Sequence, residues 1–269
     1  MSERVKGRVA IVSGSGRGIG RDIALRLAAE GAAVVVNDLD GEPAQAVVDE
    51  IAAAGGQAAA CVGDVTEDGF AERFVGTALD RFGGLDIVVN NAGYTWDNVI
   101  QKMNDEQWQA ILDLHLRAPF RILRAAGGHF RGAAPGHVRK VVNISSIAGI
   151  YGNAGQANYA SAKAGIIGLT RALAKEWGRY QVTVNCVAFG LISTRLTQTL
   201  GDAGAEIEVQ GRSIAVGLQA ATLAAFERGI PLGRAGTSRE AANGVFMLCA
   251  PESDYITGQL LEVGGGLAI

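Results

Sequence analysis

Residues 9–20 read VAIVSGSGRGIG, a short apolar run followed by a glycine-rich turn. The run is typical of a buried strand, and the helical spacing after it indicates a helix that begins near Gly20. Glycines at such a turn let the backbone approach a pyrophosphate, whose charge the helix N-terminus favours. Turns of this kind also occur for packing reasons alone. The stretch predicts a dinucleotide site with these contacts: Gly14, Ser15, Arg17, Gly18, Ile19 and Gly20.

The second apolar run, 33–37, is followed by Asp38, which lies twenty residues after Gly18. A carboxylate here can accept hydrogen bonds from the adenosine ribose hydroxyls and would repel a 2'-phosphate, which favours NAD over NADP. Arg17 has the opposite tendency, because a guanidinium beside the turn could bind that phosphate. Asp38 carries more weight because its carboxylate would lie at the ribose itself. A simple helix-start role is the alternative for Asp38.

Strand-like and helix-like segments alternate along the chain. Seven apolar runs are typical of strands: 9–13, 33–37, 58–62, 87–90, 140–144, 183–187 and 259–263. Helical spacing marks 20–31, 42–54, 70–82, 105–126, 159–178 and 239–248. This alternation predicts an α/β fold with a parallel sheet covered by helices on both faces. No linker or repeat divides residues 1–269, so one domain is expected. Residues 194–231 are expected to form short helices over a pocket, as a substrate lid.

Composition limits the classes of function. With 269 residues, 48% of them hydrophobic, and a net charge of -3, the chain can bury a full core and offers no basic stripe for nucleic acid. No apolar run approaches the roughly 20 residues that a membrane helix needs, and a cytoplasmic protein without a membrane partner is expected. Free buried thiols and no metal site are expected, because the cysteines and histidines are widely spaced: Cys61, Cys186, Cys249, His115, His129 and His137.

Tyr159 and Lys163 stand one helical turn apart, and Ser145-Ser146 precedes them by about a dozen residues. A phenol with a pKa of about 10 is a poor base at neutral pH, but a nearby ammonium and an oxidised nicotinamide both favour its ionised form. Tyr159 would take a proton from an alcohol or give one to a ketone. Lys163 would lower the pKa of Tyr159 and hold the nicotinamide ribose. Taken alone, the Tyr-Lys pair could be two unrelated groups on a solvated helix.

Four motifs resemble the short-chain dehydrogenase/reductase family in order and spacing: Ser13-Gly14-x-x-x-Gly18-x-Gly20, Asn90-Asn91-Ala92-Gly93, Ser146 and Tyr159-x-x-x-Lys163. The resemblance extends from Lys6 to Gly266. It implies a single Rossmann-type, doubly wound domain with a seven-stranded parallel sheet, usually assembled as a homotetramer. It selects Ser146 as the serine that binds the substrate oxygen, with Ser145 as a structural residue. It also implies further cofactor contacts at Asp64, Val65, Asn91, Ala92, Gly93, Ile192 and Thr194.

One catalytic position departs from the family pattern. The family's fourth catalytic residue is an Asn in the long middle helix, and His115 occupies that position here. A proton relay to Lys163 could run through the imidazole or through a water that it holds. Alternatively, His115 only replaces the structural hydrogen bond of the Asn at a helix irregularity. Both roles stay open at this point.

Three stretches resemble (3R)-hydroxyacyl-CoA dehydrogenase domains: 36–39, 115–117 and 149–159. The residues around 97–108 resemble 3-oxoacyl-carrier-protein reductases. Both resemblances imply a 3-hydroxyacyl or 3-oxoacyl thioester substrate. The apolar residues of 194–231 could line a wide pocket or be ordinary lid core: Ile207, Val209, Ile214, Val216, Leu218, Leu223 and Phe226. The alternatives are an NAD-dependent dehydrogenase of a steroid or another cyclic or secondary alcohol, and a non-catalytic NAD-binding regulator.

Overall fold

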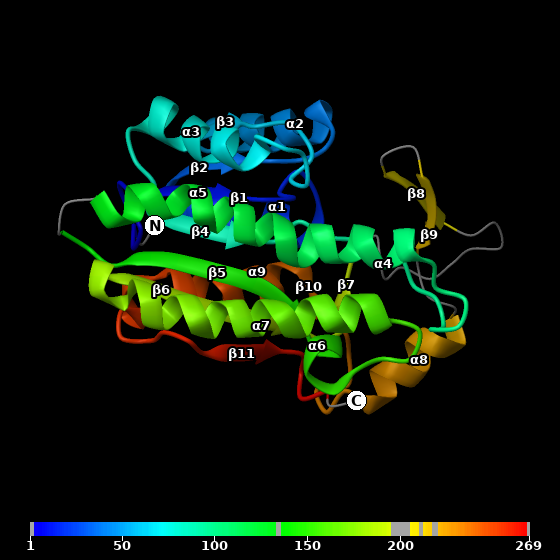
Figure 1. Ribbon diagram of the computed structural model, residues 1–269. Helices are drawn as coiled ribbons and strands as arrows, with labels where there is room; N and C mark the ends of the chain where they lie inside the picture. Colours follow the sequence, from blue (N-terminus) through cyan, green and yellow to red (C-terminus); the bar gives the residue numbers. More distant parts are fainter. Residues whose placement is uncertain (1–2, 133–135, 195–204, 210–211, 217–219, 268–269) are drawn as a thin grey trace.

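A seven-stranded parallel sheet forms the centre of the molecule (Figure 1). The computed structural model describes residues 3–132, 136–194, 205–209, 212–216 and 220–267. The strand order is β11-β6-β5-β4-β1-β2-β3. The strands are β1 Val9–Val12, β2 Ala33–Val36, β3 Gln57–Ala60, β4 Ile87–Asn90, β5 Arg139–Ser146, β6 Val182–Phe189 and β11 Leu260–Val263. The predicted α/β fold and its seven parallel strands are confirmed.

Neighbouring residues of each central strand face opposite sides of the sheet, and both sides are apolar. In β1, Val12 packs against one hydrophobic cluster and Ile11 against another, and both side chains are fully buried. A strand buried on both faces reads as a continuous apolar run, which is why the strands were visible in the sequence. Strand order reverses between β1 and β4, where such folds open a crevice at the carboxyl ends of the strands.

Helices cover the two faces of the sheet (Figure 1). One cluster joins the sheet to α1 Gly18–Ala29, α2 Gly41–Ala53 and α9 Ser238–Cys249. The other joins it to α3 Phe70–Phe82, α5 Ala118–Gly132 and α7 Ala157–Trp177. The short α6 Ala148–Tyr151 connects β5 to α7. None of the helices in the described part of the chain is both long and apolar enough to cross a membrane.

The helix expected over 105–126 is not continuous. It consists of α4 Asp105–Leu112, a π-helical turn η1 over Asp113–Arg117, and α5, which continues to Gly132. The apolar spacing predicted the position of this segment but not the wider turn, because one extra residue in a π turn leaves the neighbouring apolar residues facing the sheet. His115 lies inside that turn.

The expectation of short helices over 194–231 was only partly right. Among the described residues of this segment, two antiparallel strands, β8 Ala205–Val209 and β9 Arg212–Val216, precede helix α8 Ala220–Gly229. These elements lie beyond the carboxyl ends of the sheet strands (Figure 1). Leu223 and Phe226 are half-buried. Leu218, and the side chains of Ile207, Val209, Ile214 and Val216, lie outside the described residues.

Candidate active site

The glycine-rich turn joins β1 to α1 through a close backbone contact. A Cβ on Gly20 would lie 2.0 Å from the carbonyl oxygen of Gly14, so no other residue fits there without moving the turn. Gly18 has φ +54°, and the space beside its Cα is open. No side chain caps the N-terminus of α1, and its first turn contains no acidic residue. The free N–H groups and the open space fit a bound pyrophosphate.

Asn37 fixes this turn from the second strand. Its Oδ1 accepts from the Gly14 N–H at 3.0 Å, and its Nδ2 donates to the carbonyls of Cys61 at 3.0 Å and Gly63 at 2.9 Å. The side chain therefore ties together the ends of β1, β2 and β3. Motif spacing did not identify Asn37 as functional. The available signal was a polar residue directly after an apolar strand, which needs buried partners.

Asn91 connects the turn to the end of β4. Its Nδ2 donates to the carbonyls of Ser13 and Gly14, both at 3.0 Å. The Ser13 hydroxyl in turn accepts from the N–H groups of Asn91 and Ala92, each at 3.0 Å. The predicted residues Asn91, Ala92 and Gly93 thus lie beside the glycine turn, and the amide of Asn91 is used to hold it.

Asp38 lies directly above the turn. A Cβ on Gly16 would lie 2.5 Å from its Oδ2, and only 13% of the Asp38 side chain is exposed. Arg17 points toward the same acidic pair, with its Nη1 2.9 Å from Asp40 Oδ2 and 3.7 Å from Asp38 Oδ1. The guanidinium charge is therefore balanced by two carboxylates in this arrangement.

The remaining predicted cofactor contacts lie at the ends of β3 and β6. Asp64 Oδ1 accepts from both the N–H and the hydroxyl of Thr66 at 2.8 Å, and Val65 is buried. Ile192 is buried in the short strand β7 Ile192–Ser193, which pairs with β10 Gly236–Thr237, and Thr194 is half-buried. All of these residues follow carboxyl ends of sheet strands.

Ser146, Tyr159 and Lys163 meet between β5 and α7. The Ser146 hydroxyl donates to the Phe189 carbonyl at 3.5 Å and accepts from the Ala148 N–H at 3.2 Å. Lys163 Nζ donates to the Ile144 carbonyl at 2.8 Å and lies 5.5 Å from the centre of the Tyr159 ring. Ser145, the neighbouring serine, donates to the Lys163 carbonyl at 2.7 Å, which is a structural contact.

The two titratable groups of this centre are shifted toward their neutral forms. Burial raises the pKa of Tyr159 to about 12, while the Ser146 hydroxyl opposes this rise and the charge of Asp97 adds to it. Burial lowers the pKa of Lys163 to about 8. Lys163 was expected to lower the pKa of Tyr159. Without the positive charge of an oxidised cofactor, the effect of burial on Tyr159 is larger.

His115 is enclosed between the loop after β4 and Tyr159. Its Nε2 lies 2.7 Å from the Tyr94 carbonyl, which can only accept, so Nε2 carries the proton. The imidazole ring meets the Tyr159 ring edge-on at 5.1 Å, and a Cβ on Gly93 would lie 2.4 Å from its Cε1. Nδ1 is buried and has no hydrogen-bond partner among the described residues. Burial, followed by the charge of Lys163, holds the pKa of His115 well below its usual range.

The loop after β4 also carries residues to which spacing assigned no role. Gln156 Nε2 donates to Asp97 Oδ2 at 2.7 Å, and the Asn98 N–H donates to the Gly155 carbonyl at 2.9 Å. The buried Asn158 Nδ2 donates to the Trp96 carbonyl at 3.1 Å. These bonds fix the loop to the start of α7, beside Tyr159. The sequence signal was a group of amides immediately before Tyr159, which a helix start alone does not require.

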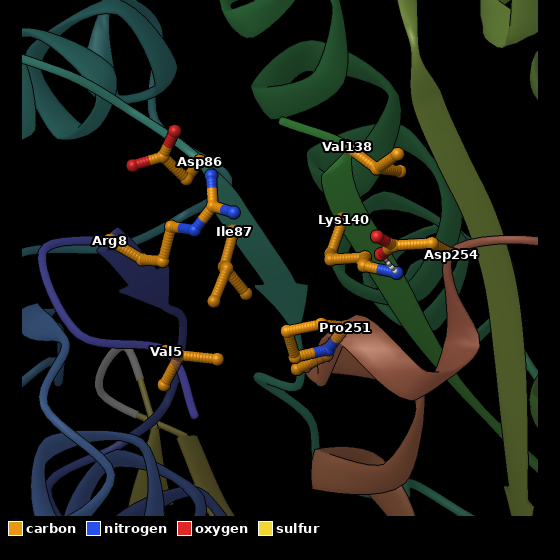
Figure 2. A pocket seen from close by; sticks show the side chains of 9 residues that line it. Val5, Arg8, Asp86, Ile87, Val138, Lys140, Pro251 and Asp254 are labelled. Carbon is orange, nitrogen blue, oxygen red and sulfur yellow. Dashed lines mark ion pairs between the residues drawn. The ribbon is translucent and has the colours of Figure 1, made fainter. Parts of the chain in front are cut away.

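A small pocket at the opposite end of the sheet is unrelated to this centre (Figure 2). It is lined by residues at the amino ends of β1, β4 and β5 and by the segment after α9: Val5, Arg8, Asp86, Ile87, Val138, Lys140, Cys249, Pro251 and Asp254. Lys140 Nζ pairs with Asp254 at 2.7 Å and donates to the Ser253 hydroxyl at 3.1 Å. Its charge is thus balanced within the protein.

Comparisons with known proteins agree with this geometry. A family model described as short chain dehydrogenase matches residues 8–204. The chain is 40% identical to the 3-oxoacyl-[acyl-carrier-protein] reductase of Vibrio cholerae over 263 residues, 98% of each chain. It is 36% identical over 265 residues to a subunit of (2S)-[(R)-hydroxy(phenyl)methyl]succinyl-CoA dehydrogenase from Thauera aromatica, again 98% of each chain.

A solved structure has the same fold over nearly the whole length. It is a gluconate 5-dehydrogenase from Burkholderia cenocepacia in complex with NADP and tartrate, 31% identical, with a TM-score of 0.86. The match covers 99% of this chain and 97% of that one. Similarity of sequence and of structure therefore extends over the cofactor crevice, the Ser-Tyr-Lys centre and the segment over the carboxyl ends of the strands.

Proposed function

Because the chain belongs to the short-chain dehydrogenase family, we propose that Tyr159 is the acid/base of a secondary alcohol/ketone oxidoreductase acting on an acyl thioester. The observation that supports this most directly is the Lys163 Nζ at 5.5 Å from the centre of the Tyr159 ring on α7, beside Ser146 at the carboxyl end of β5. Ser146 and Tyr159 are both half-buried, so a carbonyl oxygen can reach the two hydroxyls together.

The proton chemistry follows from the pKa values of the site. With a pKa of about 12, Tyr159 is protonated at neutral pH and gives its proton to the oxygen of a ketone during reduction. Ser146 donates a hydrogen bond to the same oxygen and fixes the position of the carbonyl carbon. In oxidation Tyr159 accepts the alcohol proton, a step that the ammonium of Lys163 favours. A bound nicotinamide dinucleotide supplies the hydride exchange.

We assign the cofactor to the crevice over β1, β2 and β4, and we propose NAD rather than NADP. The uncapped N-terminus of α1 and the open space at Gly18 suit the pyrophosphate. Asp38 stands where it would bind ribose hydroxyls and repel a 2'-phosphate. The positive charge of Arg17 is already paired with Asp40, so Arg17 would attract a 2'-phosphate only weakly. Asp64, Val65, Asn91, Ala92, Gly93, Ile192 and Thr194 complete the proposed contacts.

We propose that His115 positions the site and does not carry protons. Its Nε2–H donates a hydrogen bond to the Tyr94 carbonyl, which is too weak a base to take the proton away, and the ring resists protonation. The unpartnered Nδ1 can accept a hydrogen bond from a buried water near Lys163. The imidazole thus fixes the loop after β4, and its Nδ1 lone pair is available only as an acceptor. Both features favour a structural role for His115 over a proton relay through its ring.

The thioester assignment rests on two relatives whose names specify carrier-bound or CoA-bound acyl groups. We propose that residues 194–231 form the lid over the acyl chain within one catalytic domain spanning residues 1–269. We also propose a homotetramer, because α5 and α7 are long helices and the exposed Phe120 on α5 offers apolar surface to a second copy.

The test is reduction of acetoacetyl-N-acetylcysteamine, an uncharged thioester, followed as loss of NADH absorbance. The wild-type protein should turn it over, and Tyr159→Phe should lose activity by more than about a hundredfold, the typical contribution of an acid/base group. NADH binding, measured by fluorescence, should be nearly unchanged in this variant. Substantial residual turnover in Tyr159→Phe would contradict the role of Tyr159. Binding of NADH without turnover of any ketone would favour a regulator, and turnover of cyclic alcohols alone would favour the second enzyme class.

A further inference from the structure

Asp97 places a carboxylate beside the reacting tyrosine. Its Oδ2 accepts from Gln156 Nε2 at 2.7 Å, and Gln156 immediately precedes α7, three residues before Tyr159. A β-bridge between Asn98 and Gln156 holds the two backbones together. Gln156 is itself fixed, because its Oε1 accepts from Asn153 Nδ2 at 2.9 Å. The position of Asp97 relative to Tyr159 is therefore set by the fold.

Asp97 and Lys163 carry opposite charges near Tyr159 and differ in exposure. Asp97 is exposed, whereas Lys163 lies buried behind the tyrosine with its Nζ on the Ile144 carbonyl. Although the residue is exposed, its carboxylate is partly desolvated, which raises the pKa of Asp97 from its ordinary value, and the hydrogen bond from Gln156 favours the ionised form. The Asp97 charge reaches Tyr159, whose pKa it helps to raise. His115, the third titratable group here, is held neutral.

A negative charge at this position affects one class of substrate specifically. In a 3-oxo acid, the carboxylate lies two bonds from the ketone carbon that Tyr159 and Ser146 must bind. In the corresponding thioester the same position is uncharged. A like charge near the substrate carboxylate disfavours its binding, and a repulsion of about 1.4 kcal/mol corresponds to about tenfold in affinity.

Building on the proposed function, we propose that Asp97 is a specificity-determining residue that disfavours anionic substrates, so that 3-oxoacyl groups are accepted as uncharged thioesters and not as free acids. The proposal rests on the fixed Asp97–Gln156 pair at the start of α7, three residues before Tyr159. A preference for uncharged substrates would distinguish this chain from a dehydrogenase of sugar acids, although the gluconate 5-dehydrogenase has the same fold.

The test compares acetoacetate with acetoacetyl-N-acetylcysteamine in the wild-type protein and in Asp97→Asn. The amide keeps the shape of the carboxylate and an oxygen for Gln156 but removes the charge. The ratio of kcat/KM for acetoacetate to kcat/KM for the thioester should rise about tenfold or more. Binding of acetoacetate to the NADH complex, followed by NADH fluorescence with Tyr159→Phe added to both proteins to prevent turnover, should tighten by a similar factor.

Two further variants separate charge from structure. Asp80→Asn removes an exposed carboxylate from α3, far from the site, and should leave the ratio unchanged. Gln156→Ala removes the hydrogen bond to Asp97 but keeps the charge, so discrimination against acetoacetate should persist. Equal acetoacetate binding in the wild type and in Asp97→Asn, or equal gains in Asp97→Asn and Gln156→Ala, would overturn the proposal. Failure of the wild type to reduce the thioester would instead contradict the proposed function, and the binding comparison would still decide the role of Asp97.

Discussion

Asp38 and Arg17 present opposite charges to the same part of the cofactor crevice. The Asp38 carboxylate is largely buried above Gly16, while the exposed Arg17 pairs with Asp40 at 2.9 Å. A charge held in a buried position acts more strongly than one screened by solvent. The sequence placed both residues near the adenosine ribose, but their relative strength depends on burial and on Asp40, which the spacing of motifs did not indicate.

We predict that Asp38→Ala raises the ratio of kcat/KM for NADPH to kcat/KM for NADH by about tenfold or more, because repulsion of the 2'-phosphate and binding of the ribose hydroxyls are lost together. Initial rates with the two cofactors at a fixed thioester concentration measure this ratio. Asp40→Ala is the matched control: it removes a neighbouring carboxylate and releases Arg17. A larger shift in Asp40→Ala than in Asp38→Ala would show that Arg17 determines the choice of cofactor.

The predicted residues Ser146, Tyr159 and Lys163 lie together because Tyr159 and Lys163 share a helix and Ser146, selected by the family resemblance, ends the neighbouring strand. Tyr159 and Lys163 lie four residues apart on one helix, and Ser146 ends a strand that reads clearly in the sequence. Asn37 and Asp97 were not predictable in the same way. Their partners belong to loops distant in the chain, at Cys61 and Gly63 in one case and at Gln156 in the other. Only the assembled fold reveals these contacts.

The π turn is the element that distinguishes this middle helix from an ordinary one. Apolar periodicity runs through α4, η1 and α5 alike, so the sequence predicted one helix over 105–126. The π turn places the buried, neutral imidazole ring of His115 between Gly93 and Tyr159. The elements of the segment expected as a lid, 194–231, were not predicted correctly, because strand and helix signals are both weak there and β8 pairs with β9 locally.

We predict that His115 makes the protein less stable in acid. Its pKa is low in the folded state and about 6.5 in the unfolded chain, so below that pH the unfolded chain binds a proton that the folded protein does not. This one group should lower the free energy of unfolding by up to about 1.4 kcal/mol for each pH unit below 6.5. Urea unfolding between pH 7 and 5 measures the slope.

His115→Asn should reduce that slope, because an amide does not titrate in this range. His129→Asn, which replaces a half-buried histidine of α5, serves as the control for loss of a histidine elsewhere. The same acid slope in wild type and His115→Asn would mean that the buried ring is not the group responsible.

At the scale of the whole molecule, the doubly wound sheet brings the carboxyl ends of its strands to one edge, where the cofactor crevice and the catalytic centre meet. The sequence predicted this arrangement well, since strands buried on both faces give unmistakable apolar runs. Binding at that edge touches β1, β2, β4 and α1 together. Occupation of the crevice should therefore stabilise the entire fold and not only the loops that contact the ligand.

Alanine substitutions at two glycines can separate the stabilisation by bound cofactor from the effect of backbone strain. Gly18 and Gly55 both have positive φ, +54° and +82°, and at neither residue would an added Cβ have another atom within 4 Å. Alanine at either site should cost about 1 kcal/mol through the left-handed backbone conformation alone. Gly18 faces the proposed pyrophosphate site, whereas Gly55 follows α2 at the other end of the sheet. We predict that NADH at about 100 times its Kd stabilises the wild type and Gly55→Ala by about 2.7 kcal/mol, and Gly18→Ala by far less. Thermal unfolding with and without NADH measures the difference, and equal shifts in the two variants would place the cofactor elsewhere.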